Sequence, residues 1–516
     1  VLTGAGANRR AVGLAACPTT VERSAGATRS ATDRAGATGA IGAWPYPNVT
    51  LANTRVASGS NISSANVSRL REAWTFELKG WPPGGVAETG MLATNPVVQA
   101  GVVYLQDLYS NVYAIVLSTG KLKWECRVDR PVTNGPGPGG VAVAGGTVFG
   151  QSPTTAFALN AATGRPVWID EHLLSRGQGT FGIQPQVANG RVYLASQNGE
   201  GPDGGMLLAL NASNGRLVWK VGTSDAGTLG AGVVASGGAW EAPLVSADGS
   251  VSFGIGDPYQ SLGSAGTHPA PDLYDDSDVN LDAATGKLRW YYQGVTNDFE
   301  DHDMQTSPIA ASVNGTPAVI GSGKMGYVYA IDARDGALLW KTAVGEHNGH
   351  DADSRLALKH RITLAAPYTF EPGSFGGVMS NLAVAGGTVY VVTCNQPSEL
   401  PKLGSYIGLP LVGFGRATGE MEAIDANTGK VEWDTKLSAL PYGGATVAND
   451  LVFTTLYDGV LLALDRRTGA IVYRRPLPAT TNSTIAIAGN TLLVPSGGPT
   501  AETSGGTPQL VAYTLP

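Results

Sequence analysis

The chain has 516 residues and a formal net charge of −7, with acidic and basic residues interspersed. No basic cluster is present, which argues against a nucleic-acid partner. There is also no apolar run of about 18 residues that could span a membrane. Glycine contributes 71 of the residues, about twice its usual share, and this composition is typical of an all-β chain with many tight turns.

The N-terminal segment, residues 1–40, differs from the rest of the chain. It is rich in Ala, Gly, Thr and Arg without any period, and we expect a disordered leader there. We expect residues 41–516 to form a single domain. Three cysteines, Cys17, Cys126 and Cys394, are too few for a disulfide framework, so they neither indicate nor exclude an oxidising compartment.

One motif recurs seven times: a short apolar strand, a tight turn ending in glycine, and a second strand with an aromatic residue four positions after that glycine. The copies span 114–124, 158–168, 209–219, 280–290, 330–340, 423–433 and 463–473. The glycine is needed where the hairpin requires positive φ. The aromatic side chain covers the flank of the neighbouring unit. A repeat of this kind predicts a β-propeller.

Two further strand signals precede each motif, so seven blades carry four strands each. The segments 484–487, 491–494 and 509–515 provide three strands of an eighth blade. We expect segment 70–78, with Trp74, to supply the missing strand and to close the ring, which removes open sheet edges. The predicted fold is therefore an all-β, eight-bladed propeller closed by an N-terminal strand. A seven-bladed ring, padded by the C-terminal strands, is the alternative.

Departures from the repeat indicate where function lies, because a propeller carries function on loops at the mouth of its channel. The extra length falls at about 222–239, 258–277, 341–378 and 396–418. Loops of this length on a regular scaffold are usually functional.

Acidic, aromatic and basic residues gather beside these loops, namely Glu200, Trp240, Asp257, Asp298, Glu300, Asp301, Asp303 and Lys324. Taken singly, each has an ordinary interpretation as a solvated turn, a packing residue or a turn cap. Carboxylates from three successive blades, however, can converge on the ring axis, and oxygen ligands suit Ca²⁺. A lysine nearby can stabilise an anionic or carbonyl group, and a Trp can stack on a flat ring. The combination predicts a site for a metal ion and a planar ligand.

Residues 44–516 resemble the quinoprotein alcohol dehydrogenases, which carry pyrroloquinoline quinone (PQQ) in an eight-bladed propeller. The polyvinyl-alcohol dehydrogenase branch is the most similar in style. The segment WYYQGVTNDFEDHD (290–303) carries the most specific part of the resemblance. In the family, a Trp-x-x-Gln stretch leads to Asp-x-Trp-Asp, whose last Asp is the general base. Asp301 matches that base, and Glu300 replaces the Trp.

The resemblance also implies residues that hold the cofactor. Glu200 matches a calcium-ligating Glu, and Asp257 in GIGDP stands where the family has a ligating Asn. Trp240, in GAWEAP, matches the Trp under the quinone. Lys324 matches the basic residue that hydrogen-bonds the quinone oxygens. Gln197 occupies a position near the cofactor's carboxylates that is often Ser or Thr.

The identity of the metal depends on one further residue. The Asp301-x-Asp303 pair resembles lanthanide-using members of the superfamily, which coordinate through the second Asp, but it also occurs in calcium-using relatives. The expected ligands are Glu200, Asp257, Asp301 and Asp303. Ca²⁺ is the default ion and a lanthanide is the alternative.

The resemblance implies PQQ-dependent oxidation of an alcohol, secondary or polymeric in the style of the branch, with Asp301 taking the hydroxyl proton. No Cys-x-x-Cys-His haem motif occurs, so electrons would pass to a separate acceptor such as a cytochrome c. A periplasmic or extracellular location is implied as well. The alternative is a non-catalytic propeller that binds proteins, similar to the outer-membrane assembly scaffold. Dispersal of Glu200, Trp240, Asp301 and Lys324 around the ring would favour that alternative.

Overall fold

The computed structural model describes residues 17, 42–78, 92–132, 139–197, 199, 204–224, 237–258, 260–265, 273–498 and 506–516. Within these ranges the chain forms seven four-stranded sheets, one five-stranded sheet and one three-stranded sheet. The helices described are a 3-10 turn, η1 (Val67–Arg69), and α1 (Asp353–Leu358). No described helix is long and apolar enough to cross a membrane. The prediction of an all-β chain is confirmed.

The first three sheets in chain order are built from strands that follow one another directly. They contain β2–β5 (Val97–Gln99, Val102–Gln106, Val112–Val116, Leu122–Cys126), β6–β9 (Ala142–Ala144, Thr147–Ser152, Thr155–Asn160, Pro166–Asp170) and β10–β14 (Thr180–Phe181, Gln186–Ala188, Arg191–Gln197, Met206–Asn211, Leu217–Gly222). The next two contain β15–β18 (Leu244–Val245, Ser250–Gly254, Ser277–Asp282, Leu288–Gln293) and β19–β22 (Ile309–Val313, Thr316–Ser322, Tyr327–Asp332, Leu338–Ala343).

The remaining sheets include one insertion and one sheet that joins the two ends of the described chain. The sheet β24-β25-β28-β29 comprises Ala383–Ala385, Thr388–Asn395, Thr418–Asp425 and Val431–Leu437. A separate three-stranded sheet contains β23 (Tyr368–Phe370), which precedes β24, and β26 (Ser398–Leu400) and β27 (Leu409–Pro410), which lie between β25 and β28 in the chain. The last two sheets contain β30–β33 (Thr446–Ala448, Leu451–Leu456, Val460–Asp465, Ile471–Pro476) and β34 (Ala486–Ala488), β35 (Thr491–Ser496), β36 (Gln509–Thr514) and β1 (Arg71–Glu77).

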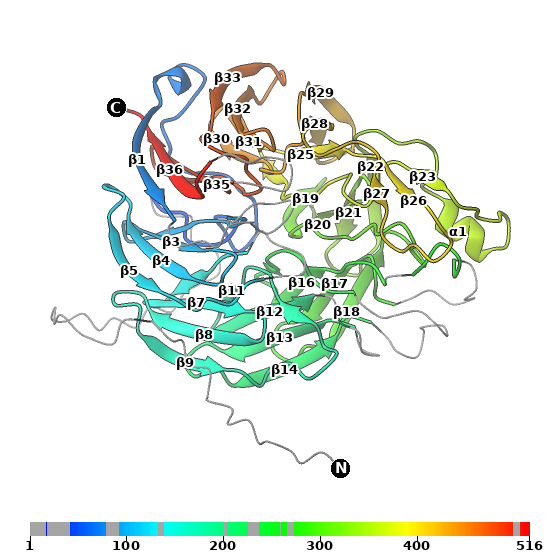
Figure 1. Ribbon diagram of the computed structural model, residues 1–516, viewed down its shortest axis with the longest axis horizontal. Helices are drawn as coiled ribbons and strands as arrows, with labels where there is room; N and C mark the ends of the chain where they lie inside the picture. Colours follow the sequence, from blue (N-terminus) through cyan, green and yellow to red (C-terminus); the bar gives the residue numbers. More distant parts are fainter. Residues whose placement is uncertain are drawn as a thin grey trace, which may run out of the picture.

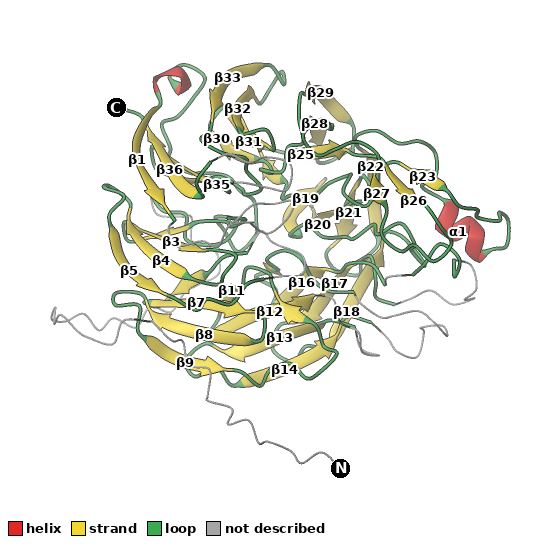
Figure 2. Ribbon diagram, in the orientation of Figure 1, coloured by secondary structure: helices red, strands yellow, loops and turns green. Residues whose placement is uncertain are grey.

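The sheets follow one another around a common centre, with the fourth strands, such as β5, β9, β14 and β33, at the perimeter (Figure 1). Neighbouring sheets meet through their innermost strands, including β2 with β6, β6 with β11, β11 with β15, and β24 with β19 and β30. Figure 2 shows α1 at the edge of the molecule, beside the inserted strands β23 and β26. The loops that carry the candidate site residues are therefore positioned by the inner strands of the sheets.

The first and last described strands share a sheet. β1 pairs antiparallel with β36, from Arg71 opposite Thr514 to Glu77 opposite Gln509. The strand order in this sheet is β1-β36-β35-β34. The C-terminal strands therefore have a sheet of their own and do not extend the β30–β33 sheet.

Tryptophans connect seven of these sheets to the sheet that follows, whereas the β30–β33 sheet carries Tyr473 at the equivalent position. Seven indole Nε1 atoms donate hydrogen bonds of 2.7 to 3.1 Å to a backbone oxygen in the turn of the following sheet; the donors are Trp74, Trp124, Trp168, Trp219, Trp290, Trp340 and Trp433. Each ring lies against the motif glycine of that turn, where a Cβ would come within 2.6 to 3.1 Å of the Trp. Trp74 of β1 contacts Gly120 in the β2–β5 sheet, so it connects the last sheet to the first.

A buried N-terminal segment, residues 44–57, connects the innermost strands of five sheets. Its backbone hydrogen-bonds to Val98 of β2, Val245 of β15, Ala310 of β19, Val384 of β24 and Val447 of β30. Arg55 in this segment is fully buried. Its guanidinium donates to Asn48 Oδ1 at 2.8 Å and to the Ala445 carbonyl at 2.8 Å, so the buried charge has polar partners, as it must.

Two of the predicted long loops form structure of their own. Segment 341–378 contains α1 and β23, and segment 396–418 contains β26 and β27; β26 pairs with both other strands. The other two long loops, 222–239 and 258–277, fall only partly within the described residues.

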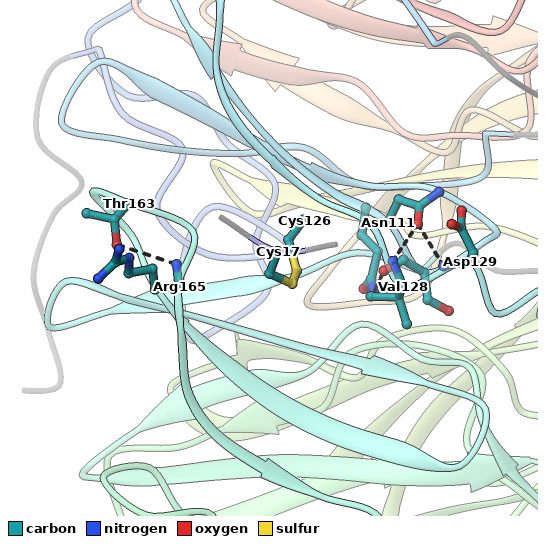
Figure 3. The surroundings of a disulfide bond; sticks show 9 residues. Cys17, Asn111, Cys126, Val128, Asp129, Thr163 and Arg165 are labelled. Atoms are coloured by element: carbon teal, nitrogen blue, oxygen red, sulfur yellow. Dashed lines mark hydrogen bonds between the residues drawn. A yellow bond between two sulfur atoms is a disulfide. The ribbon is translucent and has the colours of Figure 1, made fainter. Parts of the chain in front are cut away.

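Cys17 forms a disulfide with Cys126 at the end of β5 (Figure 3). Sequence reasoning did not find this pair, because Cys17 lies 109 positions away. Cys394 is buried and free. Apart from Cys17, residues 1–41 lie outside the described chain, so the predicted leader and domain boundary stay predictions.

We expect Gly215→Ala to destabilise the protein much more than Gly190→Ala. Both glycines have φ near +72°, and an alanine there costs about 1–2 kcal/mol. At Gly215 the Cβ would also lie 2.6 Å from the Trp168 ring, whereas Gly190 faces open space. Displacing that ring adds about 1–3 kcal/mol. Thermal denaturation of both variants measures the difference, and equal midpoints would contradict the proposed role of the Trp contact.

Candidate active site

Three buried carboxylates lie together where two neighbouring sheets meet. Asp257 follows β16, and Asp301 and Asp303 lie between β18 and β19. An oxygen of each lies within 4.8 Å of an oxygen of both others. The three residues are only 2%, 5% and 1% exposed, respectively. Residues named from separate sequence segments therefore share one buried site.

Lys324, directly after β20, supplies the positive charge of the site. Its Nζ lies 2.9 Å from Asp301 Oδ2 and 2.5 Å from Asp303 Oδ2. Burial lowers the lysine's pKa, but the attraction of Asp301 and Asp303 outweighs it, so the pKa lies above the ordinary value. One ammonium group faces three carboxyl groups.

This imbalance affects the protonation of the acids. Burial raises the pKa of Asp301 to about 8, although Lys324 opposes the shift. Burial, followed by the repulsion of Asp301 and Asp303, raises the pKa of Asp257 well above its ordinary value. Carboxyl groups held in this way bind a proton or a metal cation readily, since either relieves the repulsion.

Trp240 has a different role from the Trp residues that join the sheets. Its Nε1 donates to Asp303 Oδ1 at 3.1 Å, and the backbone N–H of Asp257 donates to the same oxygen at 2.9 Å. A Cβ on Gly256 would lie 2.0 Å from Asp303 Oδ1 and 2.6 Å from Trp240 Nε1. The glycine before Asp257 is therefore required for this close approach.

Asp298 shapes the loop that carries the acids. Its two carboxylate oxygens accept the backbone N–H groups of Glu300 at 3.2 Å and His302 at 2.7 Å. Asp301 follows with φ of +64°, a left-handed conformation that Asp tolerates better than most residues. Asp301 and Asp303 contact Lys324, whereas the side chains of Glu300 and His302 have other partners.

Those partners come from the inserted segment. The Tyr368 hydroxyl donates to Glu300 Oε1 at 2.8 Å. His302 Nε2 lies 3.1 Å from the Pro372 carbonyl. Burial, followed by the repulsion of Asp298, raises the pKa of Glu300 well above its ordinary value. Sequence reasoning missed Tyr368, and the only local signal was the acidic Glu300 in place of the family's Trp.

The structure gives fewer contacts for the remaining two predicted residues, Gln197 and Glu200. Gln197 ends β12 and is fully buried. A Cβ on Gly238 would lie 2.6 Å from the Gln197 Cα, so Gln197 adjoins the segment that carries Trp240. Glu200 lies outside the described residues, and its role stays a prediction.

Comparison with protein families identifies the class. The family model for the β-propeller domain of glucose/ethanol/alcohol dehydrogenases (PQQ) matches residues 44–167 and 185–346, which is more than half of the chain. A second model, described as outer membrane protein assembly factor BamB (PQQ_2), matches residues 324–507.

Curated relatives cover most of the chain. The quinoprotein alcohol dehydrogenase PedH of Pseudomonas putida is 26% identical over 466 residues, which cover 79% of this chain and 77% of that protein. The quinohemoprotein alcohol dehydrogenase of Comamonas testosteroni is 26% identical over 508 residues, covering 84% and 69%. A lanthanide-dependent methanol dehydrogenase of Methylacidiphilum fumariolicum is 25% identical over 524 residues, covering 84% and 80%.

Solved structures agree on the fold. The Comamonas testosteroni quinohemoprotein alcohol dehydrogenase matches with a TM-score of 0.78 at 22% identity, over 94% of this chain and 82% of that one. A europium-containing methanol dehydrogenase matches with a TM-score of 0.75 at 20% identity, over 92% and 98%. The fold is thus a β-propeller of the quinoprotein type. The chain belongs to the PQQ-dependent alcohol dehydrogenase family, a family of oxidoreductases.

We expect Lys324→Met to destabilise the protein strongly when metal ions are removed with a chelator. Removing the partner of buried charges costs about 3–5 kcal/mol, and added Ca²⁺ should restore more stability to this variant than to the native protein. Thermal denaturation with and without Ca²⁺ measures both effects. Lys341→Met is the control, because Lys341 lies over the Tyr327 ring. A Ca²⁺ response no larger in Lys324→Met than in the control would contradict a cation at this site.

Proposed function

We propose that the chain oxidises an alcohol to a carbonyl compound with PQQ, at the site formed by Asp257, Asp301, Asp303, Lys324 and Trp240. The convergence of three buried carboxylates on one lysine, beside a Trp that joins no sheets, is the observation that carries the proposal. Such a cluster is expensive to bury, so it is expected to have a ligand.

The donor atoms fit a hard cation. They are carboxylate oxygens, which Ca²⁺ and related ions prefer, and one lysine leaves negative charge uncompensated. We propose that Asp257, Asp301 and Asp303 hold Ca²⁺, with Glu200 as a further ligand and a lanthanide as the alternative ion. The lanthanide alternative is supported by the relative from Methylacidiphilum fumariolicum.

The same residues fit a flat, anionic cofactor. Trp240 offers a half-buried ring beside the carboxylates, and Lys324 offers an ammonium group to quinone oxygens. Gln197 adjoins this segment and is proposed to contact the cofactor as well. When bound, PQQ supplies a carbonyl that accepts two electrons from the alcohol, and the cation polarises it.

Asp301 is proposed as the general base because its neighbours have more partners than it has; its own Oδ2 accepts from Lys324 at 2.9 Å. Asp298 uses both oxygens to hold the backbone of its own loop. Asp303 accepts from Trp240 and the Asp257 N–H and pairs with Lys324. Asp301 is slightly more exposed than the other two clustered acids, which favours it as the acid within about 3 Å of an alcohol hydroxyl, as general-base catalysis requires.

The proposal extends to the architecture. We propose that residues 41–516 form one closed ring of eight blades, which is supported by the pairing of β1 with β36 and by the docking of Trp74 on Gly120. An oxidising location of the protein, periplasmic or extracellular, is also proposed and is supported by the Cys17–Cys126 disulfide. A secondary or polymeric alcohol stays our proposal for the substrate.

The electron acceptor is proposed to be a separate protein such as a cytochrome c. This proposal is supported by relatives whose names include that acceptor, among them the methanol dehydrogenase [cytochrome c] subunit 1 of Methylorubrum extorquens.

The competing proposal for the function of the chain is a protein-binding scaffold. A structure of BamB from Moraxella catarrhalis matches with a TM-score of 0.53 at 14% identity, over 86% of this chain and 99% of that one. A scaffold has no need for the clustered acids, so we favour catalysis.

We expect Asp301→Ala to lose alcohol oxidation while it still binds PQQ. Loss of a general base typically lowers the rate about 10²- to 10⁴-fold. The purified protein is loaded with PQQ and Ca²⁺, quinone absorbance reports binding, and dye reduction by an alcohol reports turnover. Glu420→Ala is the control, since Glu420 is also buried and paired with a lysine, Lys436. Near-normal turnover in Asp301→Ala would remove Asp301 from the mechanism and make Asp298 or Asp303 the next candidate.

We expect Asp257→Asn to weaken ion binding but to leave a functional calcium enzyme. The loss of one carboxylate should reduce Ca²⁺ affinity at least about tenfold and should reduce La³⁺ affinity more, because the lost attraction scales with the charge of the ion. Calorimetry on metal-free protein measures both affinities, and reconstitution with each ion measures activity. Activity of the native protein with La³⁺ only would overturn the calcium assignment, and activity with neither ion would favour the scaffold.

A further inference from the structure

The exposed large apolar side chains of the described residues fall into two groups. One group lies on the outermost strands β5, β9, β14, β18, β22, β29 and β33, where the repeat places one or two such residues on each strand. Scattered exposures of this kind need no explanation. The other group, here called the hairpin patch, has no counterpart in the repeat and consists of Leu403, Tyr406, Ile407, Leu409 and Leu411, which are 52%, 49%, 37%, 59% and 48% exposed.

The hairpin patch stands on a rigid support. β26 pairs with β23, and Glu399 of β26 pairs with Leu409 of β27. Beneath them Leu400 and Phe370 are buried in one cluster with Phe299. The structure thus holds Leu409 toward solvent on a paired strand, with Leu403, Tyr406, Ile407 and Leu411 in the adjoining turns, which is costly unless something covers them.

Two hydrogen bonds connect the patch to the proposed catalytic loop. The backbone N–H of Gly408 donates to Ser374 Oγ at 2.8 Å. The Ser374 hydroxyl in turn donates to the carbonyl of Glu300 at 3.1 Å. Glu300 directly precedes Asp301, so the patch lies beside the loop that carries the proposed base.

Two exposed basic side chains, Lys402 and Arg416, lie in the same inserted segment as the patch, together with one half-buried acid, Glu399 of β26. The other inserted segment carries three more exposed basic side chains, Arg355, Lys359 and Arg361. Figure 2 shows α1 near the inserted strands β23 and β26. The same segment carries the acids Glu346, Asp351, Asp353 and Glu371, of which Asp351 and Asp353 pair with His347 and His350.

We infer that the hairpin patch is the docking surface for the protein electron acceptor, a small redox protein with an apolar contact face and an acidic rim. The inference rests on the proposed function. An apolar centre with a charged rim is the composition of a protein interface, and opposite charge steers the encounter. Each alcohol yields two electrons, which leave one at a time to two acceptor molecules. Docking beside residue 301 keeps that transfer path short.

The test replaces patch residues and leaves the site intact. Leu403→Ser with Leu409→Ser is expected to lower kcat/KM for an acidic c-type cytochrome at least about tenfold, with dye-coupled turnover and the KM for alcohol unchanged. The matched control is Leu217→Ser with Leu338→Ser, two leucines that are 46% and 44% exposed on outermost strands. Lys402→Glu with Arg416→Glu is expected to slow cytochrome association and weaken its dependence on salt.

Each other result has a defined meaning. Unchanged cytochrome kinetics in both patch variants would overturn the docking surface. A raised KM for alcohol in the dye assay would assign the patch to the substrate and overturn the inference too. If the native protein with PQQ and Ca²⁺ oxidises no alcohol even with the dye, the proposed function fails. Calorimetric titration of the cytochrome into native and variant protein then decides the docking surface by itself: equal binding, or none to the native protein, overturns it.

Discussion

The contact between a tryptophan ring and the motif glycine of the next sheet is the constraint on which the rest of the structure depends. A glycine with φ between +68° and +79° makes the hairpin turn, and the same missing side chain lets the indole lie against the backbone. Any other residue would fail on both counts. Because the contact recurs at seven junctions, it fixes how seven of the sheets pack on their neighbours. The candidate site needs that precision, since its acids and its lysine come from two adjoining sheets.

The electrostatics of the site follow from this placement. Three carboxyl groups from neighbouring sheets are buried with one ammonium group, and the excess negative charge is relieved only by a proton or a cation. Asp298 adds to the repulsion that raises the pKa of Asp257 and Asp301, and it also holds the loop backbone through Glu300 and His302. Asp303 accepts from Trp240 and from the Asp257 N–H and pairs with Lys324, so it is the acid with the most contacts among the three.

The insertions extend the site beyond the regular sheets. Tyr368 bonds Glu300 from one side of the loop, and Ser374 bonds the carbonyl of the same residue. The inserted sheet therefore braces the loop and at the same time presents the hairpin patch next to it. The same few strands therefore hold the loop of Glu300 and Asp301 in position and present the proposed docking surface.

The sequence by itself determined the strands, the turns and most of the candidate site. The glycine-to-aromatic spacing is local, so it could be recognised directly, and it led to the expectation that Trp74 belongs with the C-terminal strands. Most of the site residues lie in short motifs that can be matched to those of the family, namely Trp240, Asp257, Asp301, Asp303 and Lys324. Only the tertiary structure decided that Asp301 and Asp303 face Lys324 while Glu300 faces Tyr368. It alone also paired Cys17 with Cys126. These contacts join residues from 21 to 109 positions apart, and no local pattern encodes which distant side chain will fill the space beside a given residue.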